Sequence, residues 1–216
     1  MSFYPELDRL NQEELAFRFR MPPPEGEEYA NAYYQEIAHL LREKGEGGIA
    51  FLQQEIDNEN PAKLQAILFA LTETRLPHFE LRDFLVSYLT DRRPIIVMEA
   101  IDGLRRQGEK ETVNLVLALE QHSSPYVRSS VLRFMRQLYP EQALFLLIKG
   151  LKDPDFIVRE NAVDELAELE AVEALSHLRP LIKDPHPDVR QAAQTAIEIL
   201  ESVPSDFELE ISHNER

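Results

Sequence analysis

The sequence contains no cysteine, no tryptophan and only seven glycines among its 216 residues. The lack of cysteine excludes disulfide bonds, thiolate catalysis and cysteine-ligated metal sites, and it fits a reducing compartment. No apolar run approaches the roughly 18 residues that a membrane span requires, so we expect no membrane insertion. The first thirty residues carry Glu6, Asp8, Glu13 and Glu14 and lack the apolar core of a secretory signal. We therefore expect a cytoplasmic protein.

Positive charge is also scarce. The chain has 23 basic residues against 39 acidic ones, which gives a net charge of −16. A negative field of this strength opposes binding to DNA, RNA or anionic lipid surfaces. Hydrophobic residues make up 44% of the chain and charged residues 29%, as in ordinary folded proteins. We therefore expect a folded protein whose partners are not nucleic acids.

Two nearly identical stretches begin 31 residues apart. KDPDFIVRENA begins at Lys152 and KDPHPDVRQAA begins at Lys183, and six of their eleven positions match. Steps of the same length align Arg190 with Arg159 and Arg128. Repetition at this period is typical of a solenoid, in which each repeat packs against the next.

An apolar stripe recurs at helical spacing in four repeats, and the repeat aligned at Leu64 keeps Ile67 and Leu71 but has Lys63 at the first position. The stripe is counted from Arg190 and the positions aligned with it, Arg159, Arg128 and Val97. It comprises the residue before each of these positions and the residues three and seven places after it: Val189, Ala193 and Ile197; Val158, Ala162 and Leu166; Val127, Val131 and Met135; Ile96, Ala100 and Leu104. A second apolar stretch precedes each stripe, around Leu85, Val116, Leu147 and Leu178, and proline-containing turns separate the two. The pattern predicts an all-α fold, a right-handed α-solenoid of about five helical pairs.

The two ends of the chain depart from this pattern. Residues 6–20 can form a short helix in which Asn11 and Glu14 are spaced as a capping box, and the prolines of MPPPEGEE (21–28) end it. We predict an N-terminal helix with a proline-rich linker over 1–28, the repeat array over 29–202, and an acidic flexible tail over 203–216. KGEGG (44–48) lacks the ending of a phosphate-binding loop and indicates a helix end at Gly45.

The motif Asp-Pro-x-x-x-Val-Arg-x-x-Ala after an apolar helix resembles the HEAT-repeat signature. The 31-residue form is most similar to the HEAT-like repeats of the phycobilisome lyase class. The resemblance covers about residues 47–201 and is strongest in the last two repeats. The repeat of Arg128 has His122 in place of the aspartate, and the two repeats aligned at Val97 and Leu64 lack the arginine.

This resemblance implies a function as a non-enzymatic scaffold or adaptor that binds a partner protein on a concave face lined by the second helix of each pair. The alternative that it implies is a bilin lyase subunit or a chromophore-protein chaperone, in which arginines would pair with the propionates of a bilin. The partner is then a phycobiliprotein or another HEAT chain.

Aspartate and arginine recur at the repeat period, which favours a structural role over an acid–base one. We expect a ladder in which each aspartate bonds the arginine or the backbone of its own or the next repeat, formed by Arg128, Asp153, Arg159, Asp184 and Arg190. The six histidines lack the spacing of a zinc site, and no nucleophile motif stands out. We therefore expect no catalytic residue, metal or cofactor.

One segment has the opposite charge to the rest. Residues 92–136 hold eight basic and five acidic residues, whereas the remainder of the chain carries −19. This basic band favours docking of an acidic protein segment or a carboxylate-bearing ligand. The alternative is a solvated helix face with partners one turn away. Residues predicted to face outward from the second helices and bind the partner are Gln65, Phe69, Met98, Asp102, Arg105, Arg133, Arg136 and Asp164, with Phe69 and Met98 as apolar anchors.

Overall fold

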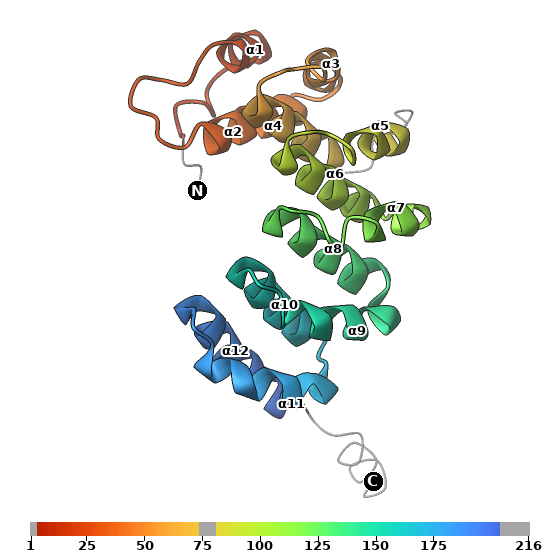
Figure 1. Ribbon diagram of the computed structural model, residues 1–216. Helices are drawn as coiled ribbons and strands as arrows, with labels where there is room; N and C mark the ends of the chain where they lie inside the picture. The colour runs from red at the N-terminus through yellow and green to blue at the C-terminus, as the bar shows by residue number, and fades with distance from the viewer. Residues whose placement is uncertain (1–3, 74–80, 204–216) are drawn as a thin grey trace, which may run out of the picture. The chain divides into compact units, whose positions relative to one another are not determined.

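The computed structural model describes residues 4–73 and 81–203. Within these ranges the protein has twelve α-helices, three short 3-10 helices and no strand (Figure 1), which confirms the all-α prediction. The predicted tail lies outside the described residues from residue 204 onward. The chain divides into two compact units, Met1–Val116 and Leu117–Arg216, and each is described separately below.

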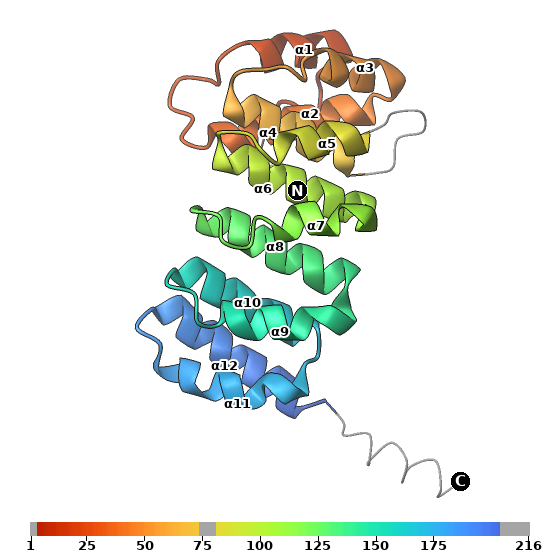
Figure 2. The same cartoon turned by 45° about the vertical axis from the view of Figure 1, so that its right-hand side comes forward.

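Unit 1 is built from two layers of helices. Its elements are α1 (Gln12–Arg20), α2 (Ala30–Glu43), α3 (Glu46–Gln54), α4 (Pro61–Thr72), α5 (Leu81–Tyr88), α6 (Pro94–Gln107), the 3-10 helix Lys110–Thr112 and α7 (Val113–Leu117), which ends at the division. Helices α2, α4 and α6 pack side by side as one layer (Figure 2). Helices α1 and α3 pack on α2, and α5 packs on α6, which forms the second layer.

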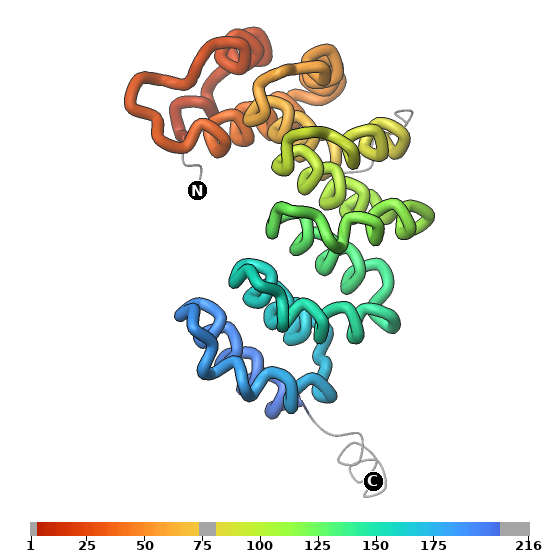
Figure 3. Tube along the Cα trace, viewed as in Figure 1, coloured from red at the N-terminus to blue at the C-terminus, as the bar shows by residue number. Residues whose placement is uncertain are grey.

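Unit 2 repeats this arrangement. Its elements are α8 (Pro125–Leu138), α9 (Pro140–Gly150), α10 (Phe156–Glu168), the 3-10 helix Val172–Ala174, α11 (Leu175–Leu178), the 3-10 helix Arg179–Lys183 and α12 (Pro187–Glu201). Helices α8, α10 and α12 pack side by side, α9 lies against α8 and α10, and α11 lies against α12 (Figure 3). Within the two units, α3 packs on α4, α5 on α6, α9 on α10 and α11 on α12, so first and second helices alternate in chain order.

The repeated apolar stripe forms the core of both units. All of its predicted members are buried except Ile197, which is partly exposed because no described helix packs on the far side of α12. The apolar residues predicted for the first helices are also fully buried: Leu85, Val116, Leu147 and Leu178. Burial of each such side chain stabilises the fold by roughly 1.5–3 kcal/mol, so stacking of the repeats supplies the main driving force.

Local sequence signals fix where the helices begin. Asn11 caps α1 in a capping box, since its Oδ1 accepts from the Glu14 N–H at 3.0 Å and its own N–H donates to the Glu14 carboxylate at 2.8 Å. The helix therefore begins at Gln12, which confirms the predicted capping box and shortens the helix expected over residues 6–20. Proline occupies the first turn of the second helices α4, α6, α8 and α12, where its missing N–H needs no partner.

The glycines of KGEGG serve the packing of α2 against α3. Gly45 adopts a φ of +81° at the junction of the two helices, a conformation that favours glycine. A Cβ atom at Gly48 would lie 1.7 Å from the carbonyl oxygen of Leu41. The two backbones therefore approach so closely that only glycine fits at position 48.

Candidate protein-binding surface

A single turn geometry precedes every second helix from α4 to α12. In each turn one side chain accepts a hydrogen bond of 2.7–3.0 Å from the backbone N–H two residues later; the acceptors are Asn58, Asp91, His122, Asp153 and Asp184. His122 accepts through Nδ1, which must therefore be unprotonated. The histidine thus makes the same turn as the aspartates, an equivalence that aligning all five turns could have indicated.

The side chain that recurs at this turn position also joins neighbouring repeats in unit 2. Nε and Nη2 of Arg128 donate to the two carboxylate oxygens of Asp153 at 2.8 and 2.7 Å, and Arg159 binds Asp184 in the same way at 2.8 Å for both bonds. The Arg159 guanidinium holds the pKa of Asp184 below its usual value. A carboxylate held ionised in this way is a poor proton acceptor, an environment that favours the predicted structural role of the ladder over an acid–base role.

Each ladder arginine uses its remaining nitrogen on its own turn. Nη1 of Arg128 donates to the carbonyl oxygens of His122 and Ser123, at 2.8 and 3.1 Å. The equivalent nitrogen of Arg159 binds the carbonyls of Asp153 and Pro154 at 2.9 and 3.1 Å. Hydrogen bonds to the arginine's own turn therefore orient the guanidinium plane for its contact with the aspartate of the next turn.

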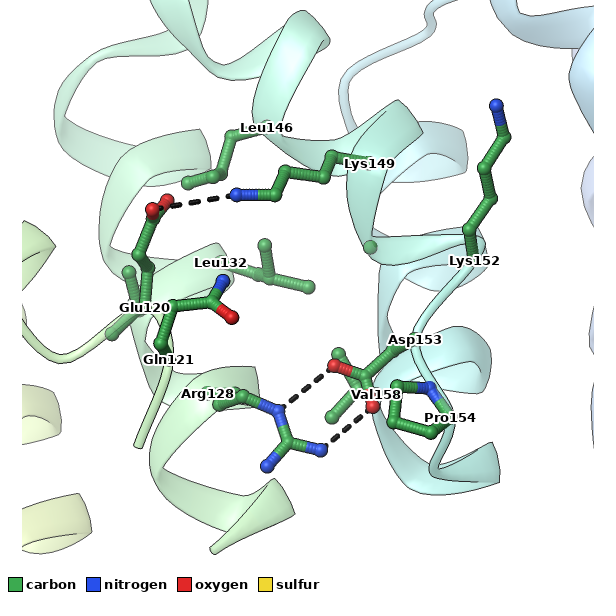
Figure 4. A pocket seen from close by; sticks show the side chains of 12 residues that line it. Glu120, Gln121, Arg128, Leu132, Leu146, Lys149, Lys152, Asp153, Pro154 and Val158 are labelled. Carbon is green, nitrogen blue, oxygen red and sulfur yellow. Dashed lines mark hydrogen bonds and ion pairs between the residues drawn. The ribbon is translucent and has the colours of Figure 1, made fainter. Parts of the chain in front are cut away.

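A pocket of about 260 Å³ opens beside the first of these ion pairs (Figure 4). Its apolar lining comes from α8, α9 and α10 and consists of Val131, Leu132, Leu146 and Val158. Arg128 and Asp153 close one side, and Lys149 pairs with Glu120 across the other at 3.3 Å. The pocket has room for an apolar group about the size of a side chain between two charged pairs.

In unit 1 the second helices are joined by a chain of polar side chains. Gln65 on α4 accepts from Asn31 of α2 and donates to Glu99 of α6, both at 3.4 Å, and Glu99 pairs with Arg106. Burial raises the pKa of Glu99, although the Arg106 guanidinium acts in the opposite direction. Arg106 also lies over the ring of Phe69, 4.9 Å from its centroid. These contacts fix α2, α4 and α6 in register.

Two residues predicted to face outward from unit 1 do not do so. Gln65 is 6% exposed and Asp102 is 8% exposed. Gln65 lies in the seam between neighbouring second helices, and Asp102 pairs with Arg105 one turn later at 3.3 Å. The helix positions that we predicted to face outward therefore include the side on which one second helix packs against the next. Phe69, Met98 and Arg105 remain partly accessible.

In unit 2 the predicted arginines bridge α8 to α10. Arg133 donates to Asn161 at 2.8 Å and to the hydroxyl of Ser130 at 2.7 Å. Arg136 forms an ion pair with the buried carboxylate of Glu165. Both arginines are partly accessible at the surface of the second helices while their charged ends are held by neighbours.

Asp164 differs from the other charged residues predicted to bind the partner, because no ion pair compensates its charge among residues 4–73 and 81–203. It is exposed on α10, yet partial removal of its carboxylate from water, followed by the nearby charges of Glu160, Glu165 and Glu168, raises its pKa to about 6. It lies in a groove of about 510 Å³ between α10 and α12, whose other lining residues are Ala167, Glu168, Glu170, Ala192, Thr195, Ala196 and Ile199. Ile199 is 44% exposed there. Sequence reasoning named Asp164 but missed the groove.

The basic band is largely neutralised in the structure. Its residues divide between the two units, with Arg105 and Arg106 on α6 and Arg133 and Arg136 on α8. Arg105, Arg106 and Arg136 each pair with a buried carboxylate, those of Asp102, Glu99 and Glu165. Arg105 pairs with Asp102 one turn away on α6, as the solvated-face alternative expects, although that carboxylate is buried. Arg106, Arg133 and Arg136 instead contact the neighbouring second helix of their unit, through Thr72, Asn161 and Glu165.

Across residues 4–73 and 81–203, no three His, Asp or Glu side chains converge as a metal site would require. No helix in that part of the chain combines the length and the apolar character needed to cross a bilayer.

The ladder and its turns agree with a comparison to known families. Residues 112–198 match the family model for HEAT repeats. This segment is therefore similar to HEAT repeats. The match contains the Arg128–Asp153 and Arg159–Asp184 pairs, so the ladder lies wholly within the matched segment. No curated protein matches the sequence significantly.

Solved structures share the fold at low sequence identity. The Escherichia coli protein YIBA superposes with a TM-score of 0.69 at 16% identity, over 92% of this chain and 76% of that one. A designed armadillo repeat protein gives a TM-score of 0.55 at 18% identity, over 88% of this chain and 100% of the other. Another, crystallised in complex with the peptide (KR)4, gives 0.55 at 17% identity over the same shares. These likenesses show that the chain has an α-solenoid fold.

Proposed function

We propose that the chain is a non-enzymatic scaffold that binds a partner protein along the surface of its second helices, the face that HEAT-type solenoids present as concave. One observation carries this proposal: in each unit the second helices lie side by side, and polar side chains bridge one to the next. The result is a broad surface of side chains that are held by their neighbours. Such a surface suits recognition of a protein segment better than enclosure of a small substrate.

The bridges favour binding because they reduce its entropic cost. A free arginine at a surface loses rotamer freedom when a partner immobilises it, at about 0.5–1.5 kcal/mol for each side chain. Arg133 is already held by Asn161 and Ser130, and Arg136 by Glu165. Their exposed edges can therefore contact a partner with little further ordering.

The predicted residues take two roles in this proposal. Phe69, Met98 and Arg105 in unit 1 make direct contacts, as do Arg133, Arg136 and Asp164 in unit 2. Gln65 and Asp102 are buried, so they position Glu99 and Arg105 and do not touch the partner. Phe69 and Met98 supply apolar contact area beside charged neighbours, a composition common at the centre of protein interfaces.

We propose that the partner is a protein segment of mixed charge. Basic side chains would lie in the groove between α10 and α12, because Asp164, Glu168 and Glu170 line it and Asp164 is not compensated. A designed armadillo repeat protein of similar fold binds the basic peptide (KR)4, which supports a peptide or protein ligand for a surface of this kind. A phycobiliprotein and a second HEAT chain remain candidate partners, and the cytoplasm remains the expected location.

Affinity capture from a native lysate tests the proposal. We expect a double variant of unit 2, Arg133→Gln with Asp164→Asn, to remain folded by circular dichroism and lose most of the captured partner. The matched control is Glu141→Gln with Lys152→Gln, which removes one charge of each sign from α9 and the following turn, outside the second helices. Equal capture by both doubles would overturn the placement of the binding surface.

The bilin-handling alternative has a separate test. The arginines that would meet bilin propionates, Arg105 and Arg136, already pair with buried carboxylates and would have to exchange partners. For that reason we place the scaffold first. A saturable shift of the bilin absorbance spectrum on titration with the chain, abolished by Arg105→Gln and Arg136→Gln, would favour the alternative.

A further inference from the structure

The ladder of arginines in unit 2 ends with an unfilled position. Nη1 of Arg190 donates to the carbonyl oxygens of Asp184 and Pro185 at 2.8 and 3.0 Å. These contacts match those of Arg128 and Arg159 with their own turns to within 0.1 Å. The Arg190 guanidinium is therefore oriented by its turn in the same way as the other two.

Among the described residues, the other two nitrogens of Arg190 have no carboxylate partner of the kind that Arg128 and Arg159 bind. Nε and Nη2 of Arg128 and Arg159 each grip a carboxylate from the next turn, in four bonds of 2.7–2.8 Å. Among the described residues, Nε and Nη2 of Arg190 have no acceptor. The side chain is nevertheless only partly exposed. Two parallel donors fixed in a plane and open to solvent match the geometry of a carboxylate.

We propose that Arg190 is a carboxylate-binding site that takes an aspartate or glutamate side chain of a partner protein docking against the last repeat. The inference rests on the proposed function as a protein-binding scaffold and names one contact of that partner. The chain itself provides the precedent, because the same fork binds an aspartate in both earlier positions. The surroundings allow it, since Asp184 in the adjoining turn is already engaged by Arg159.

The nature of the expected ligand follows from the two filled positions. In both, the bound aspartate lies in a Lys-Asp-Pro turn and also accepts a backbone N–H of its own turn, from Asp155 or His186. A partner that presents an aspartate in such a turn would reproduce the whole contact. Exposed apolar side chains at this end, Ile182 and Ile199, offer further contact area.

The test uses the purified full-length chain and a synthetic ligand, so it does not depend on finding the natural partner. The probe is a capped peptide with the sequence of residues 152–156, KDPDF, and its control carries Asp153→Asn and Asp155→Asn. Titration is followed by NMR of the arginine Nε–H groups and by polarisation of a labelled peptide. We expect a saturable shift of the Arg190 Nε–H, with no shift at Arg128 or Arg159, which are already engaged.

Variants give the outcome a magnitude. Arg190→Lys keeps the charge but loses the two parallel donors, and it should weaken peptide binding about tenfold or more. The control peptide should bind the unchanged chain more weakly to the same extent. The reason is that charge-assisted hydrogen bonds of this type contribute about 1.5–3 kcal/mol. Arg92→Lys, at an exposed arginine of unit 1, should leave the affinity unchanged.

Two results would overturn the inference. An Arg190 signal that moves no more than that of Arg92 would mean that the guanidinium is merely solvated. A full-length chain that does not respond, together with a response from residues 1–203, would assign the fork to the chain's own residues 204–216 instead of a partner. Neither result bears on capture through the second helices, so failure here and failure of the proposed function are distinguishable.

Discussion

Arg159 and Asp184 join two successive repeats of unit 2 through two parallel hydrogen bonds, each 2.8 Å long. The Asp184 side chain is only 4% exposed, so its charge depends on this one guanidinium for compensation. The same arginine binds the carbonyls of Asp153 and Pro154 in the turn before α10. One side chain thereby fixes the shape of its own turn and the position of the next.

Removal of this arginine should therefore be costly. We expect Arg159→Gln to lower the free energy of unfolding by about 2–3 kcal/mol, because it leaves a buried carboxylate without its cation. Arg190→Gln removes an equivalent residue that holds only its own turn, and should cost less than about 1.5 kcal/mol. Urea unfolding of both variants provides the measurement. Equal losses would show that the bridge between repeats contributes nothing.

The buried stripe gives a second matched pair. Val158 is buried and faces the helices that flank α10, so Val158→Asp places an unpaired carboxylate in the core and should cost several kcal/mol or unfold the repeat. Glu160→Lys, two residues away, relieves repulsion with Asp164 and should change stability by less than about 0.5 kcal/mol. Thermal melts of the two proteins should differ widely. Similar melting temperatures would contradict the helical register.

Two adjacent glycines of α3 should respond in opposite ways. Gly48→Ala drives a methyl group into the Leu41 carbonyl of α2 and should destabilise unit 1 by more than about 2 kcal/mol. A Cβ at Gly47 meets only the end of the Gln12 side chain, which can move away. Gly47→Ala should then be neutral or slightly stabilising, since alanine favours helix. Circular-dichroism melts of both variants check the contrast.

Asp164 predicts a specific dependence of stability on pH. Its pKa in the folded protein is raised to about 6, from an ordinary value of 3.8, so the folded state binds more protons than the unfolded state between these limits. Stability should therefore fall as pH rises from about 4 to 6 on account of this residue. Asp164→Asn should remove that part of the pH dependence and stabilise the protein at pH 7 by less than about 1 kcal/mol, because the group is exposed. Denaturant midpoints of the unchanged protein and the variant across pH 4–7 check this prediction. The same pH dependence in both proteins would contradict it.

The fold could be predicted because the repeat period and the helical spacing act together. Residues such as Val158 and Leu147 recur at fixed intervals, and burial of an apolar side chain depends mainly on that interval. The start of α1 was less predictable, because residues 6–10 are compatible with a helix and only the side-chain cap at Asn11 decides the boundary.

The candidate surface was harder to predict, because the position of a residue along a helix gives the direction of its side chain but not the residue that it contacts. Arg136 has an outward offset, but whether its charge is free depends on Glu165, which lies 29 residues away on another helix. The burial of Gln65 has the same origin, since its partner Glu99 belongs to the next second helix. Charge counted along the sequence suggested a basic docking band, whereas ion pairs within α6 and between α8 and α10 neutralise much of it.

The central claim is that a partner protein covers the second helices. Carboxyl footprinting of the captured complex, read by mass spectrometry, tests it most directly because exposed carboxylates lie on both layers of unit 2. Asp164 and Glu168 lie on α10, whereas Glu141 lies on α9 and Glu173 in the 3-10 helix before α11. We predict that the partner protects Asp164 and Glu168 from labelling and leaves Glu141 and Glu173 as reactive as in the free chain. Protection of Glu141 and Glu173 with Asp164 and Glu168 unchanged would place the partner on the first helices and contradict the claim.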